Sequence, residues 1–148
     1  MGVSYVSIEI ARKNLEAEHA DFEFEKTRQR AEEAWNKLLS RIQVEGGTQE
    51  DKTIFYTALY HVLLHPNILQ DVNGEYPSME TYGMKNTNGK NRYTVFSLWD
   101  TYRNVHPLLS LVYPDLQIDM VNSMLDMYKE SGWVPKCELL SMETSVMV

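Results

Sequence analysis

Residues 48–66 read TQEDKTIFYTALYHVLLHP and carry the clearest secondary-structure signal in the chain. Thr48 and Asp51 approximate a capping box, in which a hydroxyl caps a free amide and a carboxylate favours the positive end of a helix. Pro66 ends the segment. Between these limits, apolar side chains recur at helical spacing and form one broad face: Ile54, Phe55, Ala58, Leu59, Val62 and Leu63. The pattern predicts an amphipathic helix.

Further helices are predicted on both sides of this one. Upstream, residues 10–20 and 22–42 have helical periodicity, and the second segment carries one apolar stripe that includes Trp35. Downstream, a helix begins near Ser97, and Pro107 should kink or split it. The fold class is therefore mainly α.

A last helix is predicted over residues 115–131, with Gly132 as the residue that ends it. Its apolar stripe consists of Met120, Val121, Met124, Leu125 and Tyr128, and we expect Met120, Met124 and Met127 to fill the core. Residues 67–92 are rich in Asn, Gly, Thr and Lys, so we expect a long loop there.

Both ends of the chain differ from this helical pattern. Residues 3–8 are rich in β-branched and aromatic side chains and predict a short strand, which lacks a partner nearby. Residues 145–148, Ser-Val-Met-Val, are apolar, whereas chain ends are more often polar. An unpartnered strand and an apolar end together predict a piece of a larger protein.

Composition excludes several classes of function. The chain has 148 residues, a net charge of −7 and a pI of about 5.1, which argues against nonspecific binding to nucleic acid or to anionic membranes. No apolar run approaches the ~18 residues of a membrane span. A single cysteine, Cys137, cannot form an intrachain disulfide or a cysteine zinc site. The first residues lack the features of an export signal, so we expect either a cytoplasmic protein or a chain without its natural N-terminus.

The densest cluster of polar and aromatic residues is FSLWDTYR, residues 96–103. Trp99, Asp100 and Arg103 would lie on neighbouring faces of a helix. A Trp face beside a carboxylate is suited to sugar binding, because the ring packs on C–H groups and the carboxylate accepts hydroxyl hydrogen bonds. The structural alternative makes Trp99 a core residue, Asp100 a charge in the first helical turn and Arg103 a surface residue.

Two other clusters could suggest a metal, but each has a simpler explanation. Asp71-Val72-Asn73-Gly74-Glu75 offers oxygen ligands but lacks a full calcium-loop pattern, and Asn73-Gly74 is typical of a tight turn. His61 and His65 are four residues apart without the glutamate of a zinc protease motif, so we expect them, like His106, to be structural. No metal site is predicted on this chain.

Three stretches together resemble glycoside hydrolase family 92, a family of mostly bacterial, exo-acting α-mannosidases. They are TIFYTALYHVLLHPNILQDVNGEY (53–76), RYTVFSLWDTYRNVHPLLSLVYPD (92–115) and MVNSMLDMYKESGWVPK (120–136). The resemblance implies a much longer enzyme, with an N-terminal β-sandwich, a helical linker and a C-terminal (α/α)6 barrel. On this chain it implies a last sandwich strand in residues 1–9, linker helices in 10–47 and an incomplete start of the barrel in 48–148.

The resemblance also implies a chemistry. The parent enzyme would hydrolyse terminal, α-1,2-type mannose from mannan or N-glycans, with inversion and with calcium. An inverting mechanism needs a general acid and a general base separated enough to fit a water. In the family these groups and the calcium ligands lie beyond this chain, so the fragment should be inactive. The resemblance places Trp99 and Asp100 in the mannose pocket, with Arg103 and Glu143 as weaker candidates for substrate binding.

The end of the chain departs from the family pattern. The family has tryptophan where this chain has Cys137, and Gly-Asn-Glu-Thr where this chain has Ser141-Met142-Glu143-Thr144. The role of Glu143 is therefore open.

The sequence also allows alternative functions for this chain, and the resemblance implies its partners. A stand-alone helical interaction module without catalysis is the alternative, and a small helical enzyme has less support because no acid and base pair is complete. The implied partner is an α-mannoside, and apolar helix faces without partners should make the fragment self-associate. The parent family is mostly periplasmic or secreted.

Overall fold

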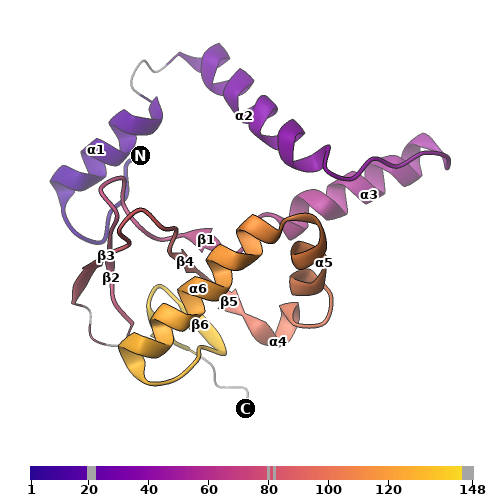
Figure 1. Cartoon of the computed structure of the whole chain (residues 1–148). Coiled ribbons are helices and arrows are strands. Elements are labelled where there is room, and N and C mark those ends of the chain that lie inside the picture. The colour runs from indigo at the N-terminus through magenta and orange to yellow at the C-terminus, as the bar shows by residue number, and fades with distance from the viewer. Residues whose placement is uncertain (20–22, 80, 82, 145–148) are drawn as a thin grey trace. The chain divides into compact units, whose positions relative to one another are not determined.

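The computed structural model describes residues 1–19, 23–79, 81 and 83–144 (Figure 1). The chain divides into two compact units. Unit 1 combines residues 1–18 with residues 66–148, and unit 2 comprises residues 19–65. Roughly half of the chain is helical, which confirms the mainly α class. The structure adds short strands in small antiparallel sheets, which were not predicted.

The described residues of unit 2 include the helices α2 (Phe24–Leu39) and α3 (Gln49–Val62). The predicted capping box is confirmed, because Thr48 Oγ1 accepts from the Asp51 amide and Asp51 Oδ2 accepts from the Thr48 amide. The rings of Trp35 and Tyr60 lie 4.4 Å apart between centroids and pack α2 on α3. The predicted helix over 22–42 is shorter at both ends, and Phe22 lies outside the described residues.

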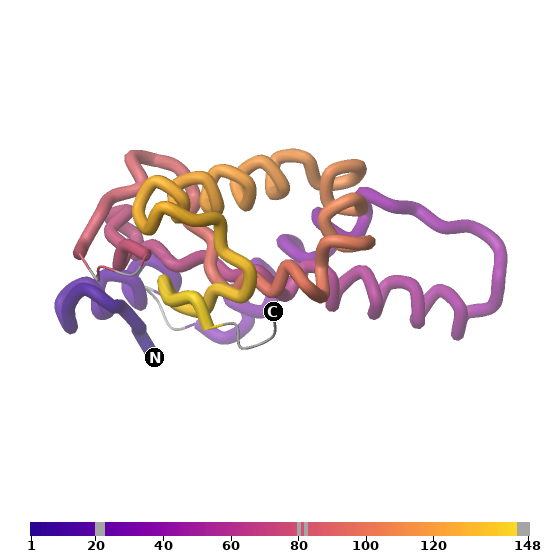
Figure 2. The backbone as a smooth tube through the Cα atoms, turned by 90° about the horizontal axis from the view of Figure 1, so that it is seen from below, coloured from indigo at the N-terminus to yellow at the C-terminus, as the bar shows by residue number. Residues whose placement is uncertain are grey.

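Unit 1 holds the remaining elements, which in chain order are α1 (Ile8–His19, with His19 itself assigned to unit 2), β1 (Asn67–Ile68), β2 (Glu75–Pro77), β3 (Met84–Asn86), β4 (Tyr93–Thr94), β5 (Phe96–Ser97), α4 (Leu98–Thr101), α5 (Val105–Val112), α6 (Pro114–Ser131), β6 (Cys137–Leu139) and β7 (Met142–Glu143). All strand pairs are antiparallel: β1 with β4, β2 with β3, and a three-stranded sheet in the order β5-β6-β7. Figure 2 shows α6 running along one side of unit 1.

The prediction of a strand over residues 3–8 is wrong. Residues 1–7, all of them described, form no strand, and α1 begins at Ile8. The cause is local: Ser4 Oγ accepts from the Val6 amide at 3.0 Å, and Ser7 Oγ accepts from the Ile10 amide at 3.2 Å. Serine hydroxyls that bond nearby amides compete with strand ladders and favour helix starts.

The segment 67–92 is more ordered than the predicted loop. Strands β1, β2 and β3 lie in it, and β1 pairs with β4 just beyond its end. The predicted tight turn is present, with Gly74 at a φ of 83° and Asn73 Oδ1 accepting from the Glu75 amide. Asp71 is buried and accepts from Ser4 Oγ at 2.7 Å and Asn14 Nδ2 at 2.6 Å, which ties the segment to α1.

The predicted helix from Ser97 is split, but before Pro107. Helix α4 ends at Thr101 and α5 starts at Val105, so Pro107 lies in the first turn of α5. A proline removes no helical hydrogen bond there, because first-turn amides lack a partner within the helix. The predicted helix over 115–131 is confirmed as α6, and Gly132 ends it with a φ of 88°.

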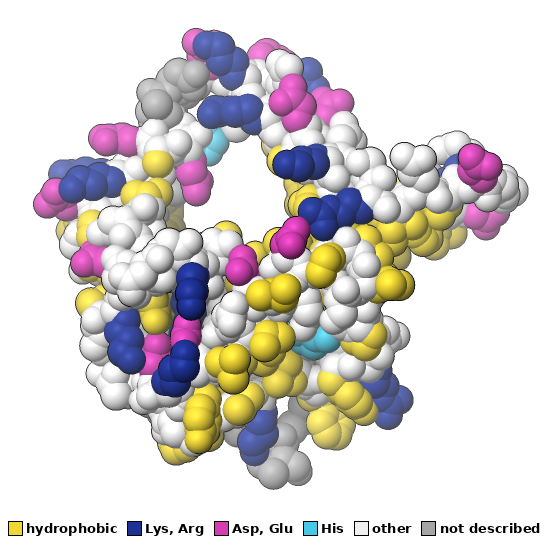
Figure 3. Space-filling view, viewed as in Figure 1, with side chains coloured by type: hydrophobic (Ala, Val, Ile, Leu, Met, Phe, Trp, Pro, Cys, Tyr) yellow, Lys and Arg dark blue, Asp and Glu magenta, His cyan; other side chains and the backbone are white. Residues whose placement is uncertain are grey.

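The inward face of α6 differs from the predicted stripe. Met120, Ser123 and Met127 are buried, and Leu109 and Tyr113 lie in the same core. Met120 and Met127 are buried, as expected for core methionines, and Met124 is half-buried. The rest of the predicted stripe is exposed and forms a row with one further residue: Ile118, Val121, Leu125 and Tyr128. Figure 3 shows hydrophobic side chains gathered at the surface over α6. These residues lie one to two turns apart on one side of the helix, which leaves an apolar outer face.

Candidate sugar-binding site

The sheet β5-β6-β7 brings the FSLWDTYR segment next to the C-terminal residues. Phe96 pairs with Glu138 and Ser97 with Cys137. Just beyond the strand, the Leu98 amide donates to the Lys136 carbonyl at 3.0 Å. The start of α4 therefore lies beside the segment that carries Glu143.

Trp99 and Asp100 both lie at the surface at the start of α4. Trp99 is 71% exposed, so its interpretation as a core residue is wrong for this structure. The Asp100 carboxylate is exposed and accepts a hydrogen bond from Ser97 Oγ at 2.5 Å. The Thr101 hydroxyl bonds the Ser97 carbonyl at 3.0 Å, which also fixes the turn from strand to helix. A flat apolar ring and an oriented carboxylate thus occupy consecutive positions of α4, and both are exposed to solvent.

The other two candidates are each engaged with neighbours. Arg103 Nε donates to the Tyr102 hydroxyl at 2.8 Å, and its guanidinium lies 5.6 Å from the centroid of that ring. The Glu143 carboxylate accepts from the backbone amides of Lys136 at 2.8 Å and Cys137 at 2.9 Å. Glu143 thus holds the start of β6 at Cys137, the residue that pairs with Ser97.

A buried carboxylate, Glu138, lies at the centre of this sheet. Glu138 is 2% exposed. Oε1 accepts from the Thr94 hydroxyl at 2.8 Å and from the Ser141 amide at 2.6 Å, and Oε2 accepts from the Val95 amide at 3.0 Å. Burial raises the pKa of the Glu138 carboxyl above its ordinary value, and these three donors oppose the rise.

The backbone around Glu138 adopts unusual conformations. Val95, Leu140 and Ser141 have φ values of 68°, 51° and 70°. Leu140 and Ser141 form the two-residue turn between β6 and β7, where a type I′ hairpin requires positive φ at both positions. Asn-Gly usually fills such a turn. The Leu140 amide donates to Thr94 Oγ1 and Ser141 Oγ to the Pro77 carbonyl, and these bonds hold the turn.

Sequence reasoning missed Glu138 and the strained residues. Glu138 stands between Cys137 and Leu139 in a three-residue strand, too short for a periodic pattern, and Leu-Ser is not a hairpin-turn signature. The positive φ at Val95, between β4 and β5, likewise falls on a residue that is not glycine, so the residue type does not predict it.

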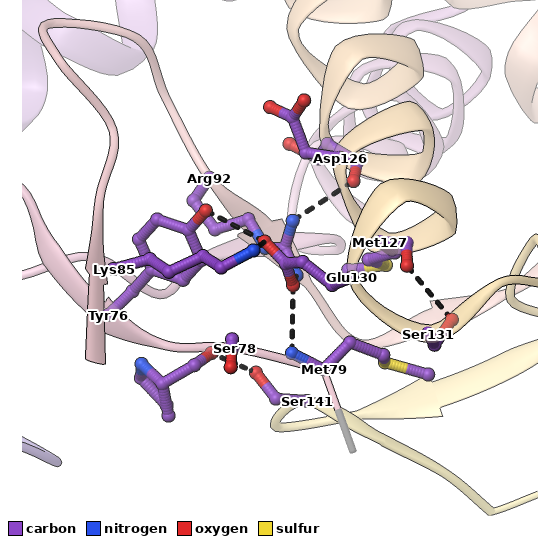
Figure 4. A network of polar contacts seen from close by, with 12 residues as sticks. Tyr76, Ser78, Met79, Lys85, Arg92, Asp126, Met127, Glu130, Ser131 and Ser141 are labelled. Atoms are coloured by element: carbon purple, nitrogen blue, oxygen red, sulfur yellow. Dashed lines mark hydrogen bonds and ion pairs between the residues drawn. The ribbon is translucent and has the colours of Figure 1, made fainter. Parts of the chain in front are cut away.

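A second buried network joins the segment 67–92 to α6 (Figure 4). Arg92 Nη2 and Glu130 Oε2 form an ion pair at 2.9 Å, with side chains 1% and 2% exposed. Glu130 also accepts from the Tyr76 hydroxyl at 2.9 Å and the Met79 amide at 2.8 Å, and Arg92 Nη1 donates to the Ser123 carbonyl. Burial raises the pKa of Tyr76, with a further contribution from its bond to Glu130.

The histidines and acidic residues show no metal site within the described ranges. No group of three or more His, Cys, Asp or Glu side chains there could hold an ion. His106 is structural as predicted, because its ring nitrogens lie 3.0 Å from Thr101 Oγ1 and 3.0 Å from Gln117 Oε1. Among the same residues no helix combines the length and apolarity needed to cross a bilayer.

The geometry has clear counterparts in known proteins. An α-mannosidase of family GH92 from Bacteroides thetaiotaomicron is similar over 98% of this chain, with 36% identity and a TM-score of 0.90. A GH92 inverting mannosidase of the same organism is similar over 98%, with 34% identity and a TM-score of 0.87. An uncharacterized secreted glycosidase of Arthroderma benhamiae is 27% identical over 143 residues, 94% of this chain.

These relatives are far longer than this chain. It spans 20% of each of the two Bacteroides chains and 14% of the Arthroderma protein. The profile of the glycosyl hydrolase family 92 catalytic domain matches residues 10–148. The domain match covers nearly the whole chain and agrees with the similar structures, so the chain belongs to glycosyl hydrolase family 92.

Proposed function

We propose that this chain is part of an exo-acting α-mannosidase that removes terminal α-1,2-linked mannose with inversion, and that it supplies Trp99 and Asp100 to the mannose pocket. The observation that carries the proposal is the exposure of Trp99, at 71%, beside the oriented carboxylate of Asp100. The exposed ring is free to pack on the C–H groups of a sugar, which a core position would not allow.

The similar structures support a mannose-related substrate. One was obtained with mannoimidazole bound, in an α-mannosidase 36% identical to this chain. The pocket would use Trp99 to pack on sugar C–H groups and Asp100 to accept hydroxyl hydrogen bonds. Mannan and N-glycans carry terminal mannose of this kind, and we assign them as the substrate class.

We infer that the 148 residues alone do not hydrolyse mannosides. The general acid and base are assigned to the part of the enzyme beyond this chain, and loss of acid and base assistance costs on the order of 10²–10⁴ in rate. The whole enzyme is proposed to use calcium. The described residues do not fit that ion, because they offer no cluster of three ligand side chains, so no step is assigned to it here.

The whole enzyme is further proposed to act outside the cytoplasm. The support is the Arthroderma relative, whose description as a secreted glycosidase applies to that protein.

The test of the pocket is Asp100→Ala in the full family 92 polypeptide that carries this segment. A hydrogen bond to a charged group contributes about 1.5–3 kcal/mol, so kcat/KM on an α-1,2-mannobiose should fall roughly ten- to a hundredfold or more. Asp115→Ala is the matched control, because Asp115 is also an exposed carboxylate in a first helical turn, that of α6. If Asp100 is only a helix-start charge, both variants lower the melting temperature slightly and spare the kinetics.

The inactivity of the fragment has its own test. The purified 148-residue chain, incubated with calcium and an α-1,2-mannobiose, should release no mannose above a heat-treated sample. Calcium-dependent release would show that the acid and base lie within these residues.

A further inference from the structure

Val95 is the only residue between β4 and β5, and it leads directly into the segment that carries Trp99 and Asp100. Its φ of 68° lies in the left-handed region. A β-branched side chain is rarely found there, because Cβ crowds the neighbouring backbone. Such a conformation persists only where surrounding contacts determine it, and it is concentrated at functional sites.

The contact that determines it is the hydrogen bond from the Val95 amide to Glu138 Oε2, at 3.0 Å. The other oxygen of the same carboxylate is occupied by the Thr94 hydroxyl and the Ser141 amide. An ionised carboxylate only accepts hydrogen bonds, so one side chain satisfies donors from two neighbouring residues of the β4-β5 junction and from the β6-β7 turn.

The path from this junction to the proposed pocket is short. Phe96 pairs with Glu138 itself, and Ser97 then donates its hydroxyl to the Asp100 carboxylate at 2.5 Å. A rotation of the backbone at Val95 would therefore move the donor that orients Asp100.

We propose that Glu138 is a positioning residue for the mannose pocket: it fixes the left-handed conformation of Val95 and so sets the direction in which β5 and α4 present Trp99 and Asp100. This inference rests on the proposed function of the pair. Glu138 is buried and acts through the backbone, so it is not itself a catalytic residue.

The two oxygens of Glu138 allow a selective variant. Glu138→Gln can keep its carbonyl oxygen at the Oε1 position and preserve both bonds there, from Thr94 and Ser141. Its amide group then faces the Val95 amide, donor against donor, and the bond to Val95 is lost. Ser141→Ala is the matched control, because it removes the buried bond from Ser141 Oγ to the Pro77 carbonyl and leaves the Val95 bond in place.

The experiment measures kinetics and hydrogen exchange on both variants of the full family 92 polypeptide, at a temperature where each is folded. We expect Glu138→Gln to lower kcat/KM on an α-1,2-mannobiose at least about tenfold more than Ser141→Ala, since displacement of a binding group by about 1 Å can cost on the order of 10²-fold. The peptide over residues 94–99 should also exchange faster in Glu138→Gln alone. Equal kinetic losses in the two variants would overturn the inference.

The exchange measurement separates this inference from the proposed function. If the unmodified enzyme has no mannosidase activity, the proposed function fails, and exchange decides the positioning role by itself. Faster exchange over residues 94–99 in Glu138→Gln, with Ser141→Ala unchanged, supports control of the junction by Glu138. Unchanged exchange in Glu138→Gln overturns it. Should Glu138→Gln fail to fold, Glu138→Asp replaces it, because the shorter side chain keeps the charge but cannot reach the Thr94 hydroxyl and the Val95 amide together. Unchanged exchange over residues 94–99 in that variant would also overturn the inference.

Discussion

Glu130→Ala should be among the most destabilising single changes in unit 1. The carboxylate accepts from Arg92 Nη2 at 2.9 Å, the Met79 amide at 2.8 Å and the Tyr76 hydroxyl at 2.9 Å, and its side chain is 2% exposed. Removal leaves the Arg92 guanidinium buried without an anionic partner, in contact with the Ser123 carbonyl and the Tyr76 ring. Breaking a buried ion pair from one side costs about 3–5 kcal/mol, a large share of the ~5–15 kcal/mol that stabilises a typical domain.

The assay is urea unfolding of the chain at pH 7, followed by far-UV circular dichroism, with melting temperatures measured in parallel. The control is Lys129→Ala, which removes a neighbouring ion pair to Asp126 whose lysine side chain is 68% exposed. That pair is screened by solvent and should contribute less than about 1 kcal/mol. Replacement of both Arg92 and Glu130 by apolar residues should cost much less than the sum of the single changes, because no uncompensated charge remains.

The reasoning is refuted if the free energy of unfolding of Glu130→Ala lies within about 1 kcal/mol of that of the unmodified chain. A double replacement that costs the full sum of its parts would likewise show that the two charges are not coupled.

Four further outcomes are expected. Thr48→Ala should lower the free energy of unfolding of unit 2 by about 1 kcal/mol, measured by urea titration, because it removes the side-chain cap of α3. Hydrogen bonds from Thr48 lower the pKa of Asp51 below 3.8. The stability that the Asp51 carboxylate adds is therefore present above pH 3.8 and is lost as the pH falls through the lowered pKa. In thermal melts, the difference in melting temperature between the unmodified chain and Asp51→Asn should vanish below that pKa. Val95→Gly should be about 1 kcal/mol more stable than Val95→Ala, the reverse of the order in ordinary strands, and equal stabilities would argue against strain at φ 68°. The chain should self-associate in sedimentation experiments, and Leu125→Lys on the exposed face of α6 should shift it toward monomer; a concentration-independent monomer before mutation would contradict this.

Sequence reasoning succeeded where the signal is local. The capping box at Thr48 and Asp51 and the start and end of α6 follow from residue types within one or two turns, and the structure has them. It failed for the short strands, because β5 and β6 have two and three residues and meet across some 40 positions of chain. The strand expected at residues 3–8 was wrong, because two serine hydroxyls outweigh the β-propensity of their neighbours.

The candidate site shows the same division. The place of Trp99 and Asp100 at a helix start follows from the order of residues, and the exposure of Trp99 removes its core interpretation. The hydrogen bond that links this segment to Glu138 is a long-range contact. It spans 43 residues from Val95 to Glu138 and involves a strained turn without the usual glycine, so no pattern of spacing could reveal it.

The division of unit 1 into two separate stretches of chain has a kinetic consequence. The hydrogen bond from Asn14 Nδ2 to Asp71 Oδ1 closes a loop of 57 residues that contains all of α2 and α3. Loop closure becomes costlier with length, by about 0.6 kcal/mol for each doubling, and contacts distant in sequence slow folding. Helices α2 and α3, by contrast, are joined by a short connection and can form early. We therefore expect α1 to dock last. Its docking rate should rise once α2 and α3 have formed, because helices shorten the chain that connects Asn14 to Asp71.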